Sequence, residues 1–153
     1  MYEIERKFLV NTSLFPGSDQ KETIKQGYLS VDPERVVRVR ISGEQAWVTI
    51  KGKMQGITRS EFEYPVPTED AESLLMLALF PPVEKIRHRL EYLGMVWEVD
   101  QFLGENDGLV MAEVELMSEN QEIVFPPWIG REVTNDTRYY NNWLSQHPYS
   151  QWK

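Results

Sequence analysis

Charged residues spaced two positions apart recur along this sequence and limit the folds that it can adopt. In the first ten residues, MYEIERKFLV, this spacing puts Glu3, Glu5 and Lys7 on one face of an extended strand, opposite Ile4 and Phe8. Doublets of charge with the same spacing return in five later stretches. The chain therefore has to provide either a wet surface for these charges or a site that encloses them.

The alternation predicts eight strands joined by turns that are rich in glycine, proline and polar residues. We expect these strands over residues 1–10, 21–31, 35–42, 45–53, 57–66, 83–92, 95–103 and 109–117. Eight antiparallel strands are enough to close a barrel. The expected fold is mainly β (α+β): a closed eight-stranded antiparallel tunnel with a charged interior, flanked by a few helices.

Two segments change from the strand period to a helical one. Thr68 begins the first, with acidic residues in its first turn, and we expect a helix over residues 69–80. An Asn135-Asp136 cap opens the second, an amphipathic helix over residues 137–146. Both helices are expected to cover outward apolar faces of the barrel.

The charged faces segregate by sign, because most predicted strands carry acids or bases but not both. The acids are Glu3, Glu5, Glu61, Glu63, Glu98, Asp100, Glu113 and Glu115, and the bases are Lys7, Arg38, Arg40, Lys51, Lys85, Arg87 and Arg89. Cross-strand pairing on a surface favours mixed signs, so this segregation indicates a binding site inside the barrel. Burying these charges in a dry interior would carry a large desolvation penalty in free energy. We expect the interior to be hydrated and to hold ligands that complete the charge balance.

Composition restricts the class of protein. With 153 residues, 41% of them hydrophobic, the chain can fill one core, and we expect one domain over residues 1–153. The absence of cysteine excludes disulfides, thiol nucleophiles and cysteine-based metal sites. No apolar run approaches the ~20 residues of a membrane span, and the net charge of -8 argues against nucleic acid as a partner. We expect a cytoplasmic protein with no membrane partner, leave a homodimer open, and expect residues 147–153 to fray.

Polyphosphate chemistry suits both signs of charge. Clustered lysines and arginines neutralise a chain of phosphoryl groups, and arginine offers paired N–H groups to phosphate oxygens. Separate carboxylates favour Mg²⁺ or Mn²⁺, because hard cations prefer oxygen ligands. Hydrolysis would then require an in-line water, activated by a carboxylate or by a second metal ion.

These motifs resemble those of the CYTH superfamily, the triphosphate tunnel metalloenzymes. The ExExK signature of that family is Glu3-Ile-Glu5-Arg-Lys7 in this chain. It is followed in family order by Arg38-Val-Arg40, Thr49-Ile-Lys51, Glu61-Phe-Glu63, Lys85-Ile-Arg87, Glu98-Val-Asp100 and Glu113-Val-Glu115. The likeness is greatest to short bacterial members, which share the QGYL segment at 26–29 and a closing segment like residues 132–139.

The resemblance implies an inorganic triphosphatase, which cleaves tripolyphosphate to pyrophosphate and phosphate with Mg²⁺ or Mn²⁺. By motif, the metal ligands would be Glu3, Glu5, Glu113 and Glu115. The groups that bind the triphosphate would be Lys7, Arg38, Arg40, Lys51, Lys85 and Arg87. The candidate catalytic groups, which would bind a second metal or orient the water, are Glu61, Glu63 and Asp100.

Other activities share the same tunnel chemistry. A class IV type adenylate cyclase would hold ATP there, but no polar cluster suited to adenine lies near Trp47 or residues 104–108. A thiamine or nucleoside triphosphatase is a second alternative. A non-catalytic module that binds polyphosphate is an alternative of another class.

Several further residues keep two interpretations. Those that either join the site or lie at the tunnel mouth as solvated charges are Arg59, Arg89 and Glu98. Tyr28 either touches phosphate or packs, and Trp47 either stacks on a base or fills one end of the tunnel. His88 lies on an outward face and His147 in the tail, so neither is expected to act as a catalytic base.

Overall fold

A computed structural model describes residues 1–152 of the chain. Its strands are Tyr2–Val10 (β1), Lys21–Ser30 (β2), Arg35–Ser42 (β3), Gln45–Gly52 (β4), Thr58–Val66 (β5), Val83–Tyr92 (β6), Met95–Phe102 (β7), Val110–Glu115 (β8) and Ile129–Glu132 (β9). Its helices are Thr68–Leu75 (α1) and Asn141–Gln146 (α2), with 3₁₀ turns at Gly104–Asn106 (η1), Thr137–Tyr139 (η2) and Tyr149–Gln151 (η3). All eight predicted strands are confirmed within two residues of their expected bounds.

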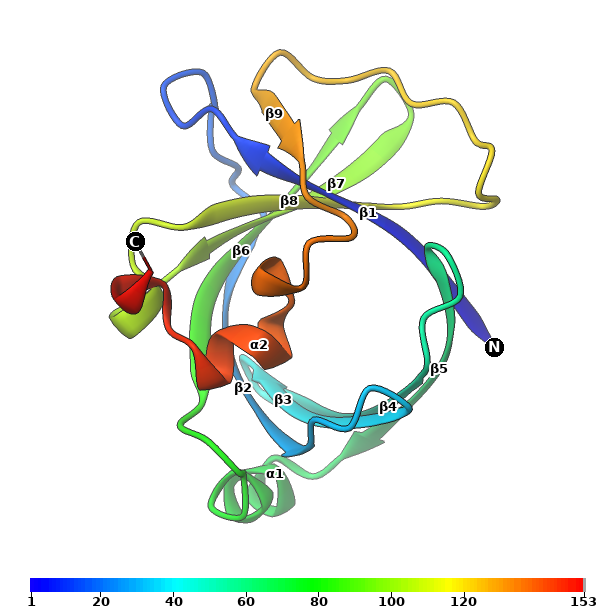
Figure 1. Ribbon diagram of the computed structural model, residues 1–153. Coiled ribbons are helices and arrows are strands. Elements are labelled where there is room, and N and C mark those ends of the chain that lie inside the picture. The colour runs from blue at the N-terminus through cyan, green and yellow to red at the C-terminus, as the bar shows by residue number, and fades with distance from the viewer. Residues whose placement is uncertain (153) are drawn as a thin grey trace.

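Strand β1 closes the barrel by pairing with two neighbours in turn. The strands follow the order β5-β4-β3-β2-β6-β7-β8-β1, and β1 also pairs with β5. Residues Tyr2–Ile4 pair with β5, whereas residues 5–9 pair with residues 111–115 of β8. Figure 1 looks into the resulting ring. The eight-stranded antiparallel barrel is thus confirmed. Strand β9 pairs with the last residues of β1, beyond the part of β1 that pairs with β5.

The closed order decides which strands face each other. Around the ring, β3 lies four strands from β8 in either direction, and Figure 1 shows the two on opposite sides of the barrel. Side chains alternate between the inside and the outside of a barrel strand. The arginine doublet of β3, Arg38 and Arg40, therefore faces the glutamate doublet of β8, Glu113 and Glu115, across the interior.

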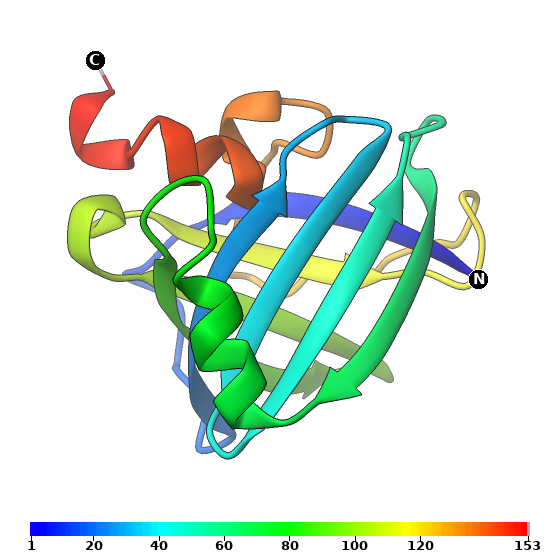
Figure 2. The ribbon, with the colours of Figure 1, turned by 90° about the horizontal axis from the view of Figure 1, so that it is seen from below.

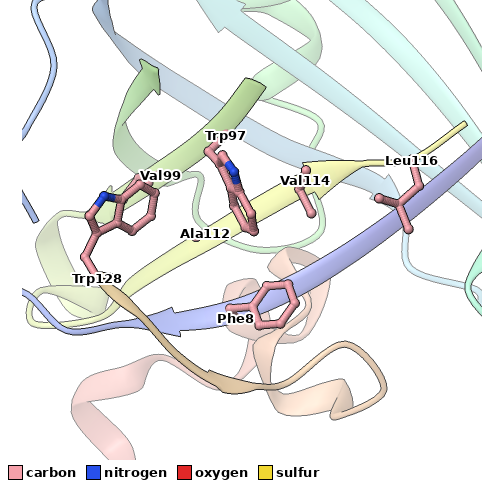
Figure 3. Close-up of a cluster of buried hydrophobic side chains, with 7 residues drawn as sticks. All are labelled: Phe8, Trp97, Val99, Ala112, Val114, Leu116 and Trp128. Carbon is pink, nitrogen blue, oxygen red and sulfur yellow. The ribbon is translucent and has the colours of Figure 1, made fainter. Parts of the chain in front are cut away.

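The outward faces of β1, β7 and β8 form a hydrophobic cluster (Figure 3), and within residues 1–152 an irregular segment, not a helix, packs on it. Trp97 is fully buried there, with its ring 5.8 Å from Phe8 and 5.9 Å from Trp128. Trp128 and Phe125 come from the segment that precedes β9. The expectation that helices cover the outward apolar faces is therefore wrong for this side. Large aromatic rings in an irregular segment bury enough area to replace a helix.

Helix α1 covers the outward face of β2, β3 and β4 (Figure 2). Gly27 of β2 permits its close approach, because a Cβ atom there would lie 3.0 Å from Leu75. The predicted helix over residues 69–80 is too long, since α1 ends at Leu75. The Leu79 N–H donates to the carbonyl of Tyr28 at 2.9 Å, and this bond to β2 draws the chain out of the helical path.

The C-terminal segment is helical only in pieces. The predicted helix over residues 137–146 is divided into η2 and α2 by Tyr140, whose backbone is extended. The tail after α2 does not fray as expected: the Trp152 ring packs edge-on against Tyr139 at 5.2 Å, while Lys153 lies outside the described residues. No helix in the described part of the chain is long and apolar enough to cross a membrane.

The charged region fills one part of the barrel interior, and an apolar floor fills the other. Val83, Phe102 and Met111 share the inward parity of the charged residues and are buried together with Leu144 of α2. Helix α2 lies across this end of the barrel (Figures 1 and 2). The charged interior is thus a chamber with a closed end.

Strand β9 was not predicted from the sequence. Prolines and glycines such as Pro126, Pro127 and Gly130 are typical of a break between elements, yet Ile129–Glu132 pair with the end of β1. A Cβ atom at Gly130 would lie 3.1 Å from the carbonyl oxygen of Leu9. Glycine at this position permits a close approach to β1 and does not interrupt the chain.

Candidate active site

The charged side chains line a chamber of about 300 Å³. Twelve of the thirteen site residues expected from the sequence lie on its wall: Glu3, Glu5, Lys7, Arg38, Arg40, Lys51, Glu61, Glu63, Lys85, Arg87, Glu113 and Glu115. The thirteenth, Asp100, is fully buried against Lys85 and Arg87 and does not reach the wall. Strand alternation therefore brings together the residues that it placed on one face.

Three inward side chains of β6 lie at different depths in the chamber, and their exposed fractions differ accordingly. The exposed fraction of the side chain is 1% for Lys85, 8% for Arg87 and 48% for Arg89. Arg89 pairs with Glu98 at 2.6 Å, which places both at the mouth. At the other end, the Lys85 ammonium lies 5.5 Å from the ring of Phe102 in the apolar floor. The chamber thus narrows from a solvated mouth to a dry base.

Asp100 fixes two cations at this base. Arg87 donates through Nε and Nη2 to the two Asp100 oxygens at 2.8 and 2.9 Å, and Lys85 Nζ lies 2.8 Å from Oδ2. Burial alone would raise the pKa of Asp100, but Arg87 and Lys85 lower it to about 2. Both carboxylate oxygens are therefore occupied by protein donors. This placement favours a positioning function for Asp100 over contact with a metal or with water.

Carboxylates crowd the wall formed by β1 and β8, which we call the acidic wall. Glu5 and Glu115 are directly opposed in the register of the two strands, where like charges repel. Lys7 lies 4.0 Å from Glu5 and 3.8 Å from Glu113, and Glu113 also lies 3.6 Å from Arg87, so Glu5 has only a share of one ammonium. Burial, together with repulsion from Glu113 and Glu3, raises the pKa of Glu5 well above its usual range. The acidic wall therefore holds unbalanced negative charge.

Glu3, at the barrel closure, is balanced by cations. Lys51 Nζ lies 3.0 Å from Glu3 and 3.2 Å from Glu61, and Arg59 lies 3.6 Å from Glu3. Burial opposes ionisation of Glu3, but the Lys51 charge lowers the pKa of Glu3 to about 2. These contacts hold β4 and β5 to β1 where the ring closes. Arg59 is thus a wall residue and joins the site.

The arginines of β3 form the opposite wall, the basic wall, and have few counterions. Arg40 donates through Nε and Nη2 to Gln26 Oε1 at 2.9 and 2.8 Å and forms no ion pair within residues 1–152. Arg38 donates to Thr49 at 3.2 Å and lies 3.5 Å from Glu63, and its buried Nε has no hydrogen-bond partner among residues 1–152. Burial and the charge of Arg38 lower the pKa of Arg40 to about 9. This wall holds unbalanced positive charge.

The acidic wall offers donors that suit a divalent cation. Its ligating atoms are carboxylate oxygens, which Mg²⁺ and Mn²⁺ prefer. Lys7 stands between Glu5 and Glu113, and no three acidic or histidine side chains in the described range are already arranged as a metal site. The raised pKa of Glu5 reports negative charge that a bound cation would neutralise. The donor chemistry therefore fits such an ion.

Three wall residues from the C-terminal segment were not predicted: Tyr140, Asn141 and Asn142. The ring of Tyr140 lines the chamber, 5.2 Å from the Lys7 ammonium. Asn141 accepts a hydrogen bond from Lys85 at 2.7 Å. The sequence signal for this contact was the pair Asn141 and Asn142. Two polar residues beside the apolar face of a helix indicate that the helix also contacts a polar site.

Tyr28 and Trp47 both lie on the chamber wall. Tyr28 is buried, and its hydroxyl accepts a hydrogen bond from Gln26 at 3.3 Å. Burial raises the pKa of Tyr28, so it is present as the neutral phenol. His88 lies outside the chamber, with its ring 5.3 Å from Phe15, which agrees with its predicted outward face.

A family model for the CYTH domain matches residues 1–142. The chain belongs to the CYTH domain family. The matched range contains all eight barrel strands and β9 and ends within α2. Membership of the CYTH family indicates dependence on a divalent metal, in agreement with the oxygen donors of the acidic wall.

Curated relatives of this CYTH chain are similar over almost its whole length. One from Acetivibrio thermocellus, named inorganic triphosphatase, is 43% identical over 152 residues and covers 99% of this chain and 97% of the relative. One from Nitrosomonas europaea, with the same name, is 37% identical over 150 residues, covering 95% and 97%. A crystal structure of an inorganic triphosphatase is 36% identical with a TM-score of 0.67, covering 93% of this chain and 96% of that one.

Proposed function

We propose that this CYTH protein hydrolyses inorganic triphosphate to pyrophosphate and phosphate with bound Mg²⁺ or Mn²⁺. The observation that carries this proposal is the opposition of the acidic and basic walls across one chamber. A polyanion carrying a divalent cation neutralises both walls at once. The volume of about 300 Å³ is at the lower end for small-molecule sites, which suits a substrate without a nucleoside. The names of the relatives support the same activity.

Cations on several strands would bind the phosphoryl oxygens. The set is Lys7, Arg38, Arg40, Lys51, Lys85 and Arg87. Each is partly or fully buried and most are held by hydrogen bonds or ion pairs before substrate arrives. Such preorganisation means that little reorganisation is needed as charge shifts between phosphoryl oxygens during the reaction.

Carboxylates of β1 and β8 would hold the metal: Glu3, Glu5, Glu113 and Glu115. A bound divalent cation neutralises phosphoryl charge and lowers the pKa of water. Lys7 lies beside Glu5 and Glu113 and would bind a phosphoryl oxygen next to the metal ligands. One strand, β1, would therefore supply groups for both parts of the bound substrate.

Glu61 and Glu63 would orient the attacking water. Burial raises the pKa of Glu61, which makes this carboxylate a better proton acceptor near neutral pH. Glu63 accepts a hydrogen bond from Thr49 at 2.8 Å and lies beside Arg38. We assign Asp100 a different function, the positioning of Lys85 and Arg87, although the sequence motif grouped it with the catalytic carboxylates.

Turnover of defined substrates tests this proposal. The purified protein is incubated with tripolyphosphate, ATP or thiamine triphosphate, each with Mg²⁺, Mn²⁺ or a chelator, and phosphate and pyrophosphate are measured. We expect tripolyphosphate to be cleaved fastest, with equal amounts of phosphate and pyrophosphate, and no turnover in chelator. The unaltered protein is compared with the variant Glu115→Gln. This variant keeps the size of a proposed metal ligand but removes its charge, and its metal-dependent turnover should be lower.

Two other outcomes would contradict the proposal. Tight binding of tripolyphosphate without turnover under either metal would indicate a non-catalytic binding module. Formation of cyclic AMP from ATP faster than tripolyphosphate cleavage would indicate a cyclase.

A further inference from the structure

Gln26 of β2 is the fully buried residue that holds Arg40. Its side-chain oxygen accepts hydrogen bonds from Arg40 Nε at 2.9 Å and Nη2 at 2.8 Å. Its nitrogen donates to Asn141 Oδ1 at 2.7 Å and to the Tyr28 hydroxyl at 3.3 Å. Every polar atom of the Gln26 side chain is therefore in use before any ligand binds.

Donor chemistry fixes the orientation of the two amides. Lysine and arginine side chains can only donate, so they must meet amide oxygens. Asn141 presents Oδ1 to Lys85 Nζ at 2.7 Å, Gln26 in turn presents its nitrogen to the same Oδ1, and its oxygen is left for Arg40. The result is a continuous chain from β6 through α2 and β2 to β3.

This arrangement differs from the one that holds Arg87. Asp100 fixes Arg87 through two hydrogen bonds and cancels its charge. Gln26 makes the same two-bond contact with Arg40 through a neutral oxygen. Arg40 forms no ion pair within residues 1–152, and burial, Arg38 and Arg87 lower its pKa to about 9 despite the opposing charge of Asp100.

We propose that Gln26 is a positioning and specificity-determining residue, which holds the Arg40 guanidinium in place while leaving its positive charge available to a polyanion. Asn141 positions Lys85 in the same way, by accepting a hydrogen bond from its ammonium through a neutral amide oxygen. This inference rests on the proposed function, because it assigns Arg40 to the triphosphate. It explains why an amide and not a carboxylate occupies this buried position: a carboxylate would hold Arg40 more firmly but would compete with the substrate for it.

The variant Gln26→Glu tests this inference, because it keeps the shape and the acceptor for Arg40, replaces the N–H donor to Asn141 and Tyr28 by an oxygen, and adds a negative charge. Binding of tripolyphosphate is measured by calorimetry in chelator, and KM and kcat are measured with Mg²⁺ or Mn²⁺. We expect Kd and KM to rise by at least about tenfold and kcat to change by less than about threefold. The matched control is Gln101→Glu, the same change on an exposed outward position of β7, which should leave all three values unchanged.

The outcomes separate a charge requirement from simple packing. If Gln26 served only to anchor Arg40 structurally, Gln26→Glu would form an ion pair and leave Kd unchanged, which would overturn the proposal. If this variant fails to fold, Asn141→Asp places the same charge beside Lys85 at the base of the chamber, and unchanged binding there would also overturn the proposal.

Failure of the proposed function gives a different pattern. Unaltered protein that binds tripolyphosphate in chelator but never hydrolyses it would contradict the enzymatic activity, while the calorimetric comparison would still decide the function of Gln26. Absence of tripolyphosphate binding by the unaltered protein would overturn both.

Discussion

The acidic and basic walls are built from the same strand pattern but store opposite charge. On the acidic wall, Glu5 and Glu115 face each other across neighbouring strands and share few cations. On the basic wall, Arg40 is held by a neutral amide and has no acidic partner within residues 1–152. The two walls lie opposite each other in the ring and cannot pair directly. The chamber is therefore complementary to a ligand with both signs of charge and to neither sign alone.

The base of the chamber shows a third arrangement, in which charge is balanced within the protein. Asp100 occupies its oxygens with Arg87 and Lys85 and stays dry. A buried pair of this kind is weak evidence for added stability, but the loss of one partner is costly. We infer that balanced charge at the base maintains the fold and positions Lys85 and Arg87, whereas the unbalanced charge on the two walls supplies most of the attraction for a ligand.

The largest expected effect is on folding, from Asp100→Asn. The variant leaves Arg87 and Lys85 buried without their anion, and we expect the free energy of unfolding to fall by about 3–5 kcal/mol. Urea denaturation followed by circular dichroism measures this loss. The matched control is Arg89→Gln at the mouth, where the ion pair with Glu98 is partly exposed and its loss should cost less than about 1 kcal/mol. Equal losses in the free energy of unfolding would mean that ion pairs at the base and at the mouth contribute equally to stability.

The second effect is on turnover, from Glu5→Gln. Because a neutral amide is a poor ligand for a divalent cation, we expect metal-dependent hydrolysis to fall at least about a hundredfold. Stability should move in the opposite direction. The raised pKa of Glu5 means that its ionisation costs stability as the pH rises above its usual 4.5, and the amide removes this cost. A less stable variant at pH 7 would contradict the description of the acidic wall as a region of excess charge.

Acid should weaken the protein through its balanced carboxylates. The pKa of Asp100 is lowered from its usual 3.8 to about 2, so its contribution is present above pH 4 and is lost as the pH falls towards 2. We expect this residue to account for roughly 2 kcal/mol of the unfolding free energy lost between pH 4 and pH 2. Urea denaturation across this range measures the change. A flat profile would show that the ion pairs at the base do not persist in solution.

The smallest effect is expected from Arg40→Ala on the basic wall. No carboxylate is left without a partner, but the buried Gln26 oxygen loses its two donors, so the free energy of unfolding should fall by about 1 kcal/mol. The KM for tripolyphosphate should nevertheless rise by about tenfold, because a charge-assisted hydrogen bond to phosphate is lost. Steady-state kinetics and thermal denaturation measure the two quantities. An unchanged KM would show that Arg40 does not contact the substrate.

Strand alternation predicts most of this architecture because it acts at a period of two residues that the sequence displays directly. The eight strands and their inward faces follow from the position of the charged doublets, such as Glu3 with Glu5 and Arg38 with Arg40. Alternation does not report depth along the barrel axis. It therefore places Asp100 and Glu98 on the same inward face but does not show that Asp100 is buried at the base, where its oxygens are occupied, while Glu98 lies at the mouth.

Features that depend on distant contacts were missed for a related reason. The end of α1 is decided by the Leu79 hydrogen bond to Tyr28, and β9 forms because Gly130 can approach Leu9. Neither contact has a local signature in the sequence. The amides of Gln26 and Asn141 were likewise passed over, because only the assembled structure places them between two cations.

The divided pairing of β1 bears on the order in which the protein folds. Residues 5–9 pair with residues 111–115, and the last residues of β1 pair with β9. Strand β1 can therefore complete its pairing only after β8 and β9, which come late in the sequence, have been synthesised. Loop closure over such a separation is slow compared with formation of the β2–β3–β4 hairpins. Until it occurs the acidic wall does not exist, since β1 and β8 each bring half of it. Metal binding should therefore be acquired in one late step, together with ring closure, and a fluorescent divalent-ion probe followed during refolding would report that step directly.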